Sequence, residues 1–244
     1  MKSHIQSLFS LPDSFILGSM GEILASPLSY LVYAVSLVVA ITIHEFAHAY
    51  IADRLGDPTP RLQGRLTLNP LAHLDPLGTI MLFLVRFGWG KPVEFDPFNL
   101  RNPRRDGAMI SLAGPASNLT AAVFTSILLR FFPPFQYLAI AHGTIASTIA
   151  GNLIFLFLQS FVVLNVILAI FNLVPIHPLD GFKIVGGFLT RESAREWYKL
   201  ERYGILMLLV LFLPLSGNSS LIHQIISPPI NILLSLLLPQ QPLI

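Results

Sequence analysis

The residues best suited to chemistry in this chain form the stretch His44-Glu45-Phe46-Ala47-His48. Two histidines four residues apart share one face of a helix, since a turn takes about 3.6 residues, so both imidazoles can hold one zinc ion. The glutamate between them then points near the same metal, where it can act as the general base for a water molecule. The competing interpretation is that both histidines are polar residues of a buried helix that binds no metal.

A third zinc ligand must come from elsewhere in the chain, because catalytic zinc sites use three protein ligands. One pattern of soluble zinc proteases requires a glycine and a histidine three and six residues after the second histidine, but Ile51 and Arg54 occupy those positions. A second pattern requires a helical glutamate some tens of residues later. It is poorly met, because the next glutamate is Glu94 in a proline-rich stretch.

The histidines lie at the far end of an apolar segment that begins near Leu28 and has no charged residue up to Ile43. A helix that is apolar on every side is buried in protein or in lipid. An ionisable cluster at the end of such a helix indicates a functional site.

The composition is that of a membrane protein. Of 244 residues, 53% are hydrophobic and 11% are charged, against roughly 25% charged in soluble domains. The absence of cysteine excludes disulfides and thiolate zinc sites. We expect the lipid bilayer as a partner and no nucleic acid.

The apolar segments predict an all-α polytopic membrane protein with a three-helix catalytic core and peripheral spans. The core is expected over residues 28–190, with spans at 28–52, 108–132 and 147–174. An N-terminal interfacial segment is expected over residues 1–27. Residues 191–244 are expected to contain the end of an amphipathic surface helix, predicted over 182–203, and apolar peripheral segments at 205–215 and 221–238.

Two elements between the first and second spans have their own patterns. Residues 77–87 are apolar but shorter than the ~17 residues needed to cross a bilayer, so they predict a re-entrant or interfacial segment. Residues 88–105 contain three prolines and the alternating Val93 and Phe95, which predicts a short β-hairpin or extended edge on the cytoplasmic side.

The basic residues predict the orientation, because Lys and Arg concentrate in cytoplasmic loops. Eight lie between the first and second spans: Arg54, Arg61, Arg65, Arg86, Lys91, Arg101, Arg104 and Arg105. Five follow the third span: Lys183, Arg191, Arg195, Lys199 and Arg202. The loop over residues 133–146 has none, and only Arg130 lies near the outer end of a span.

The same topology nominates the third ligand. His44 and His48 lie within three turns of Arg54, and Asp180 lies three residues before Lys183. Both groups are therefore expected at similar depth, just inside the cytoplasmic face of the cell membrane.

With these features the chain resembles the site-2 protease family of intramembrane zinc metalloproteases. The resemblance rests on His44-Glu45-Phe46-Ala47-His48, on Gly114-Pro115-Ala116-Ser117-Asn118, and on Asn172-Leu173-Val174-Pro175 followed by Leu179-Asp180-Gly181. It extends to Leu68-Asn69-Pro70, His73-Leu74-Asp75-Pro76 and Gly88-Trp89-Gly90-Lys91-Pro92, which are similar to the small prokaryotic members.

The resemblance implies that His44, His48 and Asp180 ligate one zinc ion per chain and that Glu45 is the general base. It also implies that Asn172 lies near the metal and helps to bind the oxyanion, with a helix–helix hydrogen bond as the alternative. Asn118 is expected to serve helix packing, and Gly114 to allow close helix approach.

Three further polar residues have open roles. His177 is expected to face water, with a place behind the zinc ligands or a substitute ligand as alternatives. His73 and Asp75 either line the way into the site or cap the short helix that follows them.

The expected function is hydrolysis of peptide bonds within or near the membrane segment of a single-span membrane protein or peptide. The chain would be a minimal member without a PDZ module. The extended residues 89–98 would pair with the substrate as an added strand, or form a surface hairpin with no such role. The alternatives from other classes are a membrane metal-binding or transport protein and a catalytically silent scaffold. The oligomeric state does not follow from the sequence.

Overall fold

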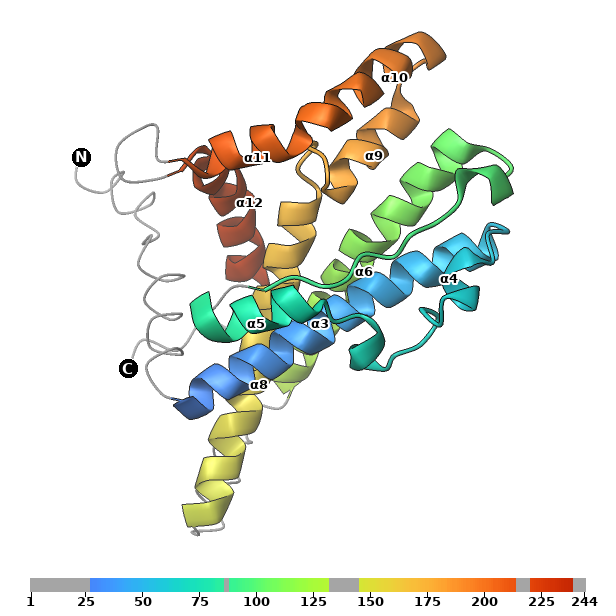
Figure 1. Cartoon of the computed structure of the whole chain (residues 1–244). Coiled ribbons are helices and arrows are strands. Elements are labelled where there is room, and N and C mark those ends of the chain that lie inside the picture. The colour runs from blue at the N-terminus through green and yellow to red at the C-terminus, as the bar shows by residue number, and fades with distance from the viewer. Residues whose placement is uncertain (1–26, 86–87, 132–144, 214–219, 239–244) are drawn as a thin grey trace, which may run out of the picture.

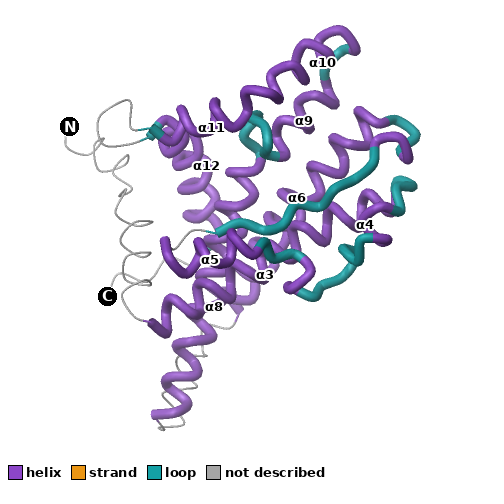
Figure 2. The backbone as a smooth tube through the Cα atoms, viewed as in Figure 1, coloured by secondary structure: helices purple, strands orange, loops and turns teal. Residues whose placement is uncertain are grey.

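The computed structural model describes residues 27–85, 88–131, 145–213 and 220–238, and these form helices joined by loops (Figures 1 and 2). The predicted N-terminal interfacial segment, apart from its last residue, and nearly all of the predicted outer loop lie outside the described residues.

Three long helices form the centre of the fold: α3 (Pro27–Arg54), α6 (Pro103–Phe131) and α8 (Ile145–Asn172). Each contains a stretch that is long and apolar enough to cross a membrane. The mostly helical fold and the three predicted spans are therefore confirmed, with helix ends that differ from the prediction by five residues or fewer.

The three long helices pack against one another in pairs. Small side chains make the contacts close, since Ser36, Ala40 and Ala49 on α3 are fully buried. Membrane helices associate through such small residues and through interhelical hydrogen bonds. One such bond joins α6 to α8, where Asn118 Nδ2 donates to Asn165 Oδ1 at 2.7 Å.

Short helices lie between α3 and α6: α4 (Thr59–Leu62), η1 (Pro70–Ala72), α5 (Pro76–Val85) and η2 (Pro97–Asn99). The carboxylate of Asp75 accepts a hydrogen bond from the Gly78 amide at 2.8 Å, which confirms that Asp75 caps α5. Ten residues span about 15 Å, too short to cross the bilayer. Leu82 packs this helix against α3.

The predicted β-hairpin is not confirmed. Among the described residues no strand occurs, and an isolated antiparallel bridge joins Leu74 to Gly90. Pro92, Pro97 and Pro103 remove backbone donors, and proline is compatible only with edges and bulges of a sheet.

The C-terminal part contains α9 (Asp180–Phe188), α10 (Arg191–Tyr198), η3 (Lys199–Tyr203), α11 (Gly204–Phe212) and α12 (Leu221–Leu237). The single surface helix predicted over residues 182–203 is divided at Thr190, whose hydroxyl accepts a hydrogen bond from the Ser193 amide and so starts a new helix.

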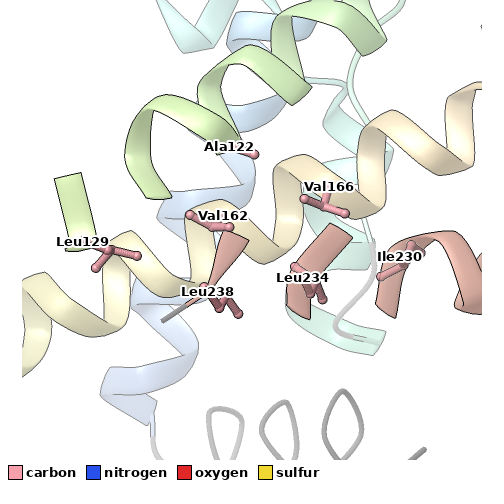
Figure 3. Packing of buried hydrophobic residues seen from close by; sticks show 7 residues of the cluster. All are labelled: Ala122, Leu129, Val162, Val166, Ile230, Leu234 and Leu238. Atoms are coloured by element: carbon pink, nitrogen blue, oxygen red, sulfur yellow. The ribbon is translucent and has the colours of Figure 1, made fainter. Parts of the chain in front are cut away.

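Helix α12 packs against α8 and α6 through an apolar cluster (Figure 3). Its buried members are Ala122, Leu129, Val162, Val166, Ile230, Leu234 and Leu238. Beside the cluster, the Arg130 guanidinium donates to the Leu236 carbonyl. The basic residue that did not fit the loop pattern therefore has a partner on α12.

Asp57 joins the end of α3 to the segment before α6. Its fully buried carboxylate accepts hydrogen bonds from Thr59 Oγ1 at 2.6 Å, Asn99 Nδ2 at 2.8 Å and the Asp96 amide at 2.7 Å. Burial alone would raise the pKa of Asp57, but these hydrogen bonds lower it below its usual value. The ionised form is therefore the one that holds the two segments together.

We expect Asp57→Asn to lower the stability of the folded protein by about 1–3 kcal/mol near neutral pH, because an amide nitrogen would face the Asp96 N–H or the Asn99 amide. A lowered pKa means that the contribution is complete above the unfolded value of about 3.9 and is lost as the pH falls through the lower folded value.

Thermal unfolding of the detergent-solubilised protein from pH 8 to pH 3 measures this. The difference between the native chain and Asp57→Asn should stay constant above pH ~5 and shrink below pH ~4. Asp53→Asn is the control, because Asp53 pairs with the exposed Arg61 side chain. An unchanged difference at all pH values would contradict the assignment.

Candidate metal centre

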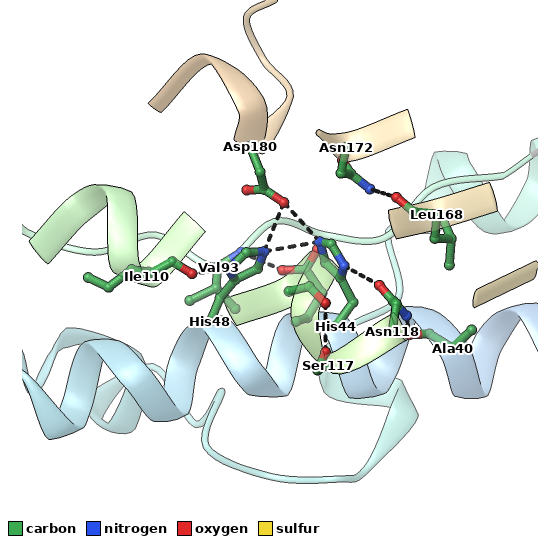
Figure 4. A network of polar contacts seen from close by, with 12 residues as sticks. Ala40, His44, His48, Val93, Ile110, Ser117, Asn118, Leu168, Asn172 and Asp180 are labelled. Carbon is green, nitrogen blue, oxygen red and sulfur yellow. Dashed lines mark hydrogen bonds and ion pairs between the residues drawn. The ribbon is translucent and has the colours of Figure 1, made fainter. Parts of the chain in front are cut away.

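Three predicted ligands meet at the junction of α3 and α9 (Figure 4). His44 and His48 are buried on one face of α3, and Asp180 is the first residue of α9. Asp180 Oδ2 lies 3.2 Å from His44 Nε2 and 3.3 Å from His48 Nε2, and the two Nε2 atoms are 3.0 Å apart. The structure therefore brings Asp180 to two histidines that precede it by 132 and 136 positions in the chain.

The other nitrogen of each imidazole is held by α6. His44 Nδ1 lies 2.5 Å from Asn118 Oδ1, and His48 Nδ1 lies 2.7 Å from the Ile110 carbonyl oxygen. Both partners are acceptors, because the Asn118 amide nitrogen donates to the Ala40 carbonyl and to Asn165. Each ring is therefore protonated at Nδ1, which directs the Nε2 lone pair inward.

Three lone-pair atoms thus face one another. The Asp180 Oδ2 atom is buried and accepts no hydrogen bond from the described residues. Two neutral imidazoles and a carboxylate at 3.0–3.3 Å would repel one another without a cation between them. The edge of a zinc tetrahedron with Zn–N near 2.0–2.1 Å is about 3.3 Å, so the observed spacing fits zinc.

Gly181 explains how α9 comes so close to the end of α8. A Cβ atom at this position would overlap the carbonyl oxygens of Leu173 and Val174. Glycine therefore allows the irregular segment 173–179 to fold tightly and to present Asp180 toward α3.

Gly114 has a similar role on α6. A Cβ atom there would lie 2.6 Å from His44 Nε2 and would also overlap His48 Nε2. The predicted role of Gly114 was close helix approach. In the structure, the absence of a side chain at Gly114 also leaves room for the two Nε2 atoms.

Glu45 lies on the neighbouring face of α3 and is partly buried. Its Oε2 atom accepts a hydrogen bond from the Val93 amide at 2.9 Å. The Val93 amide belongs to the extended segment 91–96, which runs alongside α3 (Figure 1). The backbone of this segment therefore orients the predicted general base.

Arg65 holds the segment 91–96 in place through hydrogen bonds to main-chain carbonyl groups. Its buried guanidinium donates to the carbonyl oxygens of Ala72 and Lys91. Burial lowers the pKa of Arg65 below its usual value, and it outweighs the nearby carboxylates of Glu45 and Glu94, which raise the pKa. From the sequence Arg65 was one of eight basic loop residues, and nothing in its type singled it out.

The remaining predicted residues have defined partners. Asn172 Nδ2 donates to the Leu168 carbonyl of its own helix at 2.9 Å, which is neither the oxyanion role nor a helix–helix bond (Figure 4). His177 Nδ1 lies 3.6 Å from Glu201 Oε1 and is not part of the metal-ligating group. His73 is fully buried, with Nε2 2.8 Å from the Thr67 carbonyl oxygen.

Asn118 is expected from the sequence to serve helix packing, and in the structure it also contacts His44. The Gly-Pro-Ala-Ser-Asn motif was the available signal. The Ile110 carbonyl and the Val93 amide are main-chain groups, so their contacts with His48 and Glu45 cannot be predicted from residue type.

The chain is similar to one peptidase family and to bacterial proteins that are named as putative zinc metalloproteases. The sequence profile of Peptidase family M50 matches residues 32–213. The chain is 38% identical over 200 residues to the "Putative zinc metalloprotease YwhC" of Bacillus subtilis (strain 168), which covers 82% of this chain and 88% of that protein. It is 34% identical over 197 residues to the "Putative zinc metalloprotease Rip2" of Mycolicibacterium smegmatis, covering 77% and 70%.

No solved structure matches the chain. The family profile covers three quarters of the residues and includes the whole metal-ligating group. The chain therefore belongs to peptidase family M50, the site-2 protease family of membrane zinc metalloproteases.

Proposed function

We propose that this membrane peptidase hydrolyses a peptide bond within or next to the membrane segment of a single-span protein, with His44, His48 and Asp180 as zinc ligands and Glu45 as general base. The observation that carries the proposal is the convergence of three lone-pair atoms at 3.0–3.3 Å beside a glutamate of the same helix. When bound, zinc supplies Lewis-acid activation of water and of the scissile carbonyl.

Glu45 is placed to move the proton. The Val93 amide donates to Oε2, and no described residue donates to Oε1, so that oxygen is available to take a proton from water and to return it to the leaving amine. The Asn172 amide would have to leave its bond to Leu168 before it could contact a substrate oxyanion.

The substrate must be extended at the scissile bond, because a helix hides its peptide groups. Residues 91–96 are an extended segment beside Glu45, and Lys91, Pro92 and Glu94 in it are exposed. Pairing of a substrate strand with this segment would place the scissile bond over the metal centre. The irregular segment 173–179 supports water access from the same side, since non-helical backbone at membrane depth is tolerated where it lines a wet cavity.

The first prediction from the proposed function concerns Glu45. We expect Glu45→Gln to lower the cleavage rate of a reconstituted single-span substrate by roughly 10²- to 10⁴-fold, since the amide cannot accept the proton. Zinc content measured by mass spectrometry should stay at one ion per chain. Glu196→Gln, on the exposed face of α10, is the matched control.

A zinc chelator should abolish cleavage by the native chain in the same assay. Cleavage that persists with both the chelator and Glu45→Gln would refute the proposed metallopeptidase mechanism. A biological effect that survives Glu45→Gln would instead favour the scaffold function.

The second prediction concerns zinc affinity. Gly114→Ala places a methyl group against both Nε2 atoms, so we expect a loss of zinc affinity of about tenfold or more. Gly107→Ala is the control on the same helix, because its Cβ would meet only Phe95 ring carbons at 3.5 and 3.6 Å. Competition with a fluorescent zinc chelator measures both. Equal affinities in the two variants would rule out the assigned position of the metal.

The third prediction concerns orientation, which we propose places the metal centre near the cytoplasm. The chain has no cysteine, so single substitutions report accessibility cleanly. Leu28 at the start of α3 and Leu62 in α4 beyond its end are both exposed. An impermeant maleimide should label Leu28→Cys in intact cells and Leu62→Cys only in inverted vesicles. The reverse pattern would place the metal centre on the outer side.

A further inference from the structure

A cavity of about 440 Å³ lies apart from the metal centre, between the N-terminal end of α6, α9 and α10. Its wall includes Phe95, Arg104, Lys183, Arg191, Arg195 and Tyr198. Four of these six residues are cations, and no carboxylate belongs to the lining. The cavity has the volume of a small-ligand site.

The cations of the cavity have no acidic partner. None of the four forms an ion pair with any residue that the structure describes. Lys183 Nζ lies 4.6 Å from the centroid of the Phe95 ring, which keeps the ammonium beside the cavity by a cation–π contact.

The backbone adds to the positive potential. Arg104 lies in the first turn of α6, and Arg191 is the first residue of α10. Helix N-terminal ends carry partial positive charge and disfavour cations. Each of these first turns also contains one acidic residue, Asp106 in α6 and Glu192 in α10. Neither carboxylate lines the cavity, so the charged side chains of its wall are the four cations.

We propose that this cavity binds the phosphate of an anionic ligand at the cytoplasmic membrane surface. A guanidinium group forms two parallel hydrogen bonds with two phosphate oxygens. This geometry favours phosphate over an anion that cannot accept two such bonds. The cavity lies at the membrane-surface end of the spanning helix α6. The phosphate source is therefore a phosphatidylglycerol-type headgroup or free phosphate, and the experiment below separates the two. Lys183 is three residues from Asp180 on α9, so an occupant contacts the helix that carries a zinc ligand.

The test uses the full chain in phosphatidylcholine nanodiscs at constant ionic strength. One arm adds inorganic phosphate, and the other replaces part of the lipid with phosphatidylglycerol carrying a fluorescent acyl chain, with binding read by energy transfer from this lipid to an acceptor-labelled protein. The pocket variant is Arg191→Gln with Arg195→Gln. The control is Arg101→Gln with Arg105→Gln, which removes the same charge from exposed positions outside the cavity.

We expect the pocket variant to weaken binding by about 25-fold, since each basic residue near an anionic surface contributes roughly fivefold. The control should change it by less than about threefold, because Arg101 and Arg105 do not line the cavity. Phosphatidylglycerol binding without phosphate binding identifies the lipid headgroup, and binding in both arms identifies phosphate itself. Equal weakening in the two variants, or no binding in either arm, overturns the proposal. The readout is binding, so it stands or falls separately from peptide hydrolysis.

Discussion

The fold depends on one electrostatic constraint, the confinement of two imidazole lone pairs and one carboxylate oxygen within 3.0–3.3 Å of each other. In a buried site such an arrangement is unfavourable without a cation. A site whose ligands meet only in the folded chain rarely exists in the unfolded state, so metal binding to such a site stabilises the fold. Each helix that contributes an atom to the centre also contributes to the affinity for zinc.

Helix α6 supplies no ligand and yet determines the geometry. Its Ile110 carbonyl and its Asn118 side chain hold the two Nδ1 atoms, and Gly114 leaves the space between these contacts free. Asn165 extends the same chain of hydrogen bonds to α8 and donates in turn to the Phe161 carbonyl. The polar network therefore crosses all three membrane helices, which is costly in lipid unless every member is satisfied.

The candidate ligand group was predictable from helix spacing and charge distribution. A spacing of four residues defines a helix face, and the distribution of Lys and Arg defines depth, so His44, His48 and Asp180 could be placed together without coordinates. The motif also indicated Glu45. The three spans followed from apolar length alone, whereas the division of the surface helix at Thr190 depends on one capping hydroxyl within a charged segment.

The supporting contacts could not be predicted in the same way. Arg65 and Val93 act through main-chain groups of segments that meet only in the folded chain. Asn118 was assigned to packing because an asparagine in a membrane helix usually hydrogen-bonds to a neighbouring helix, and it does so while also holding His44. The β-hairpin was expected from alternating side chains, but the prolines at 92 and 97 leave the segment extended and without a sheet partner.

The coordination of the bound metal tests the account most directly. X-ray absorption at the zinc edge of the purified native chain should show nitrogen and oxygen neighbours near ~2.0–2.1 Å and outer-shell scattering from two imidazoles, and metal analysis should give one zinc per chain. Asp180→Ala should retain both imidazole signals and lose the oxygen of the carboxylate. A spectrum without two imidazoles, or a chain that binds no zinc, would contradict the central claim.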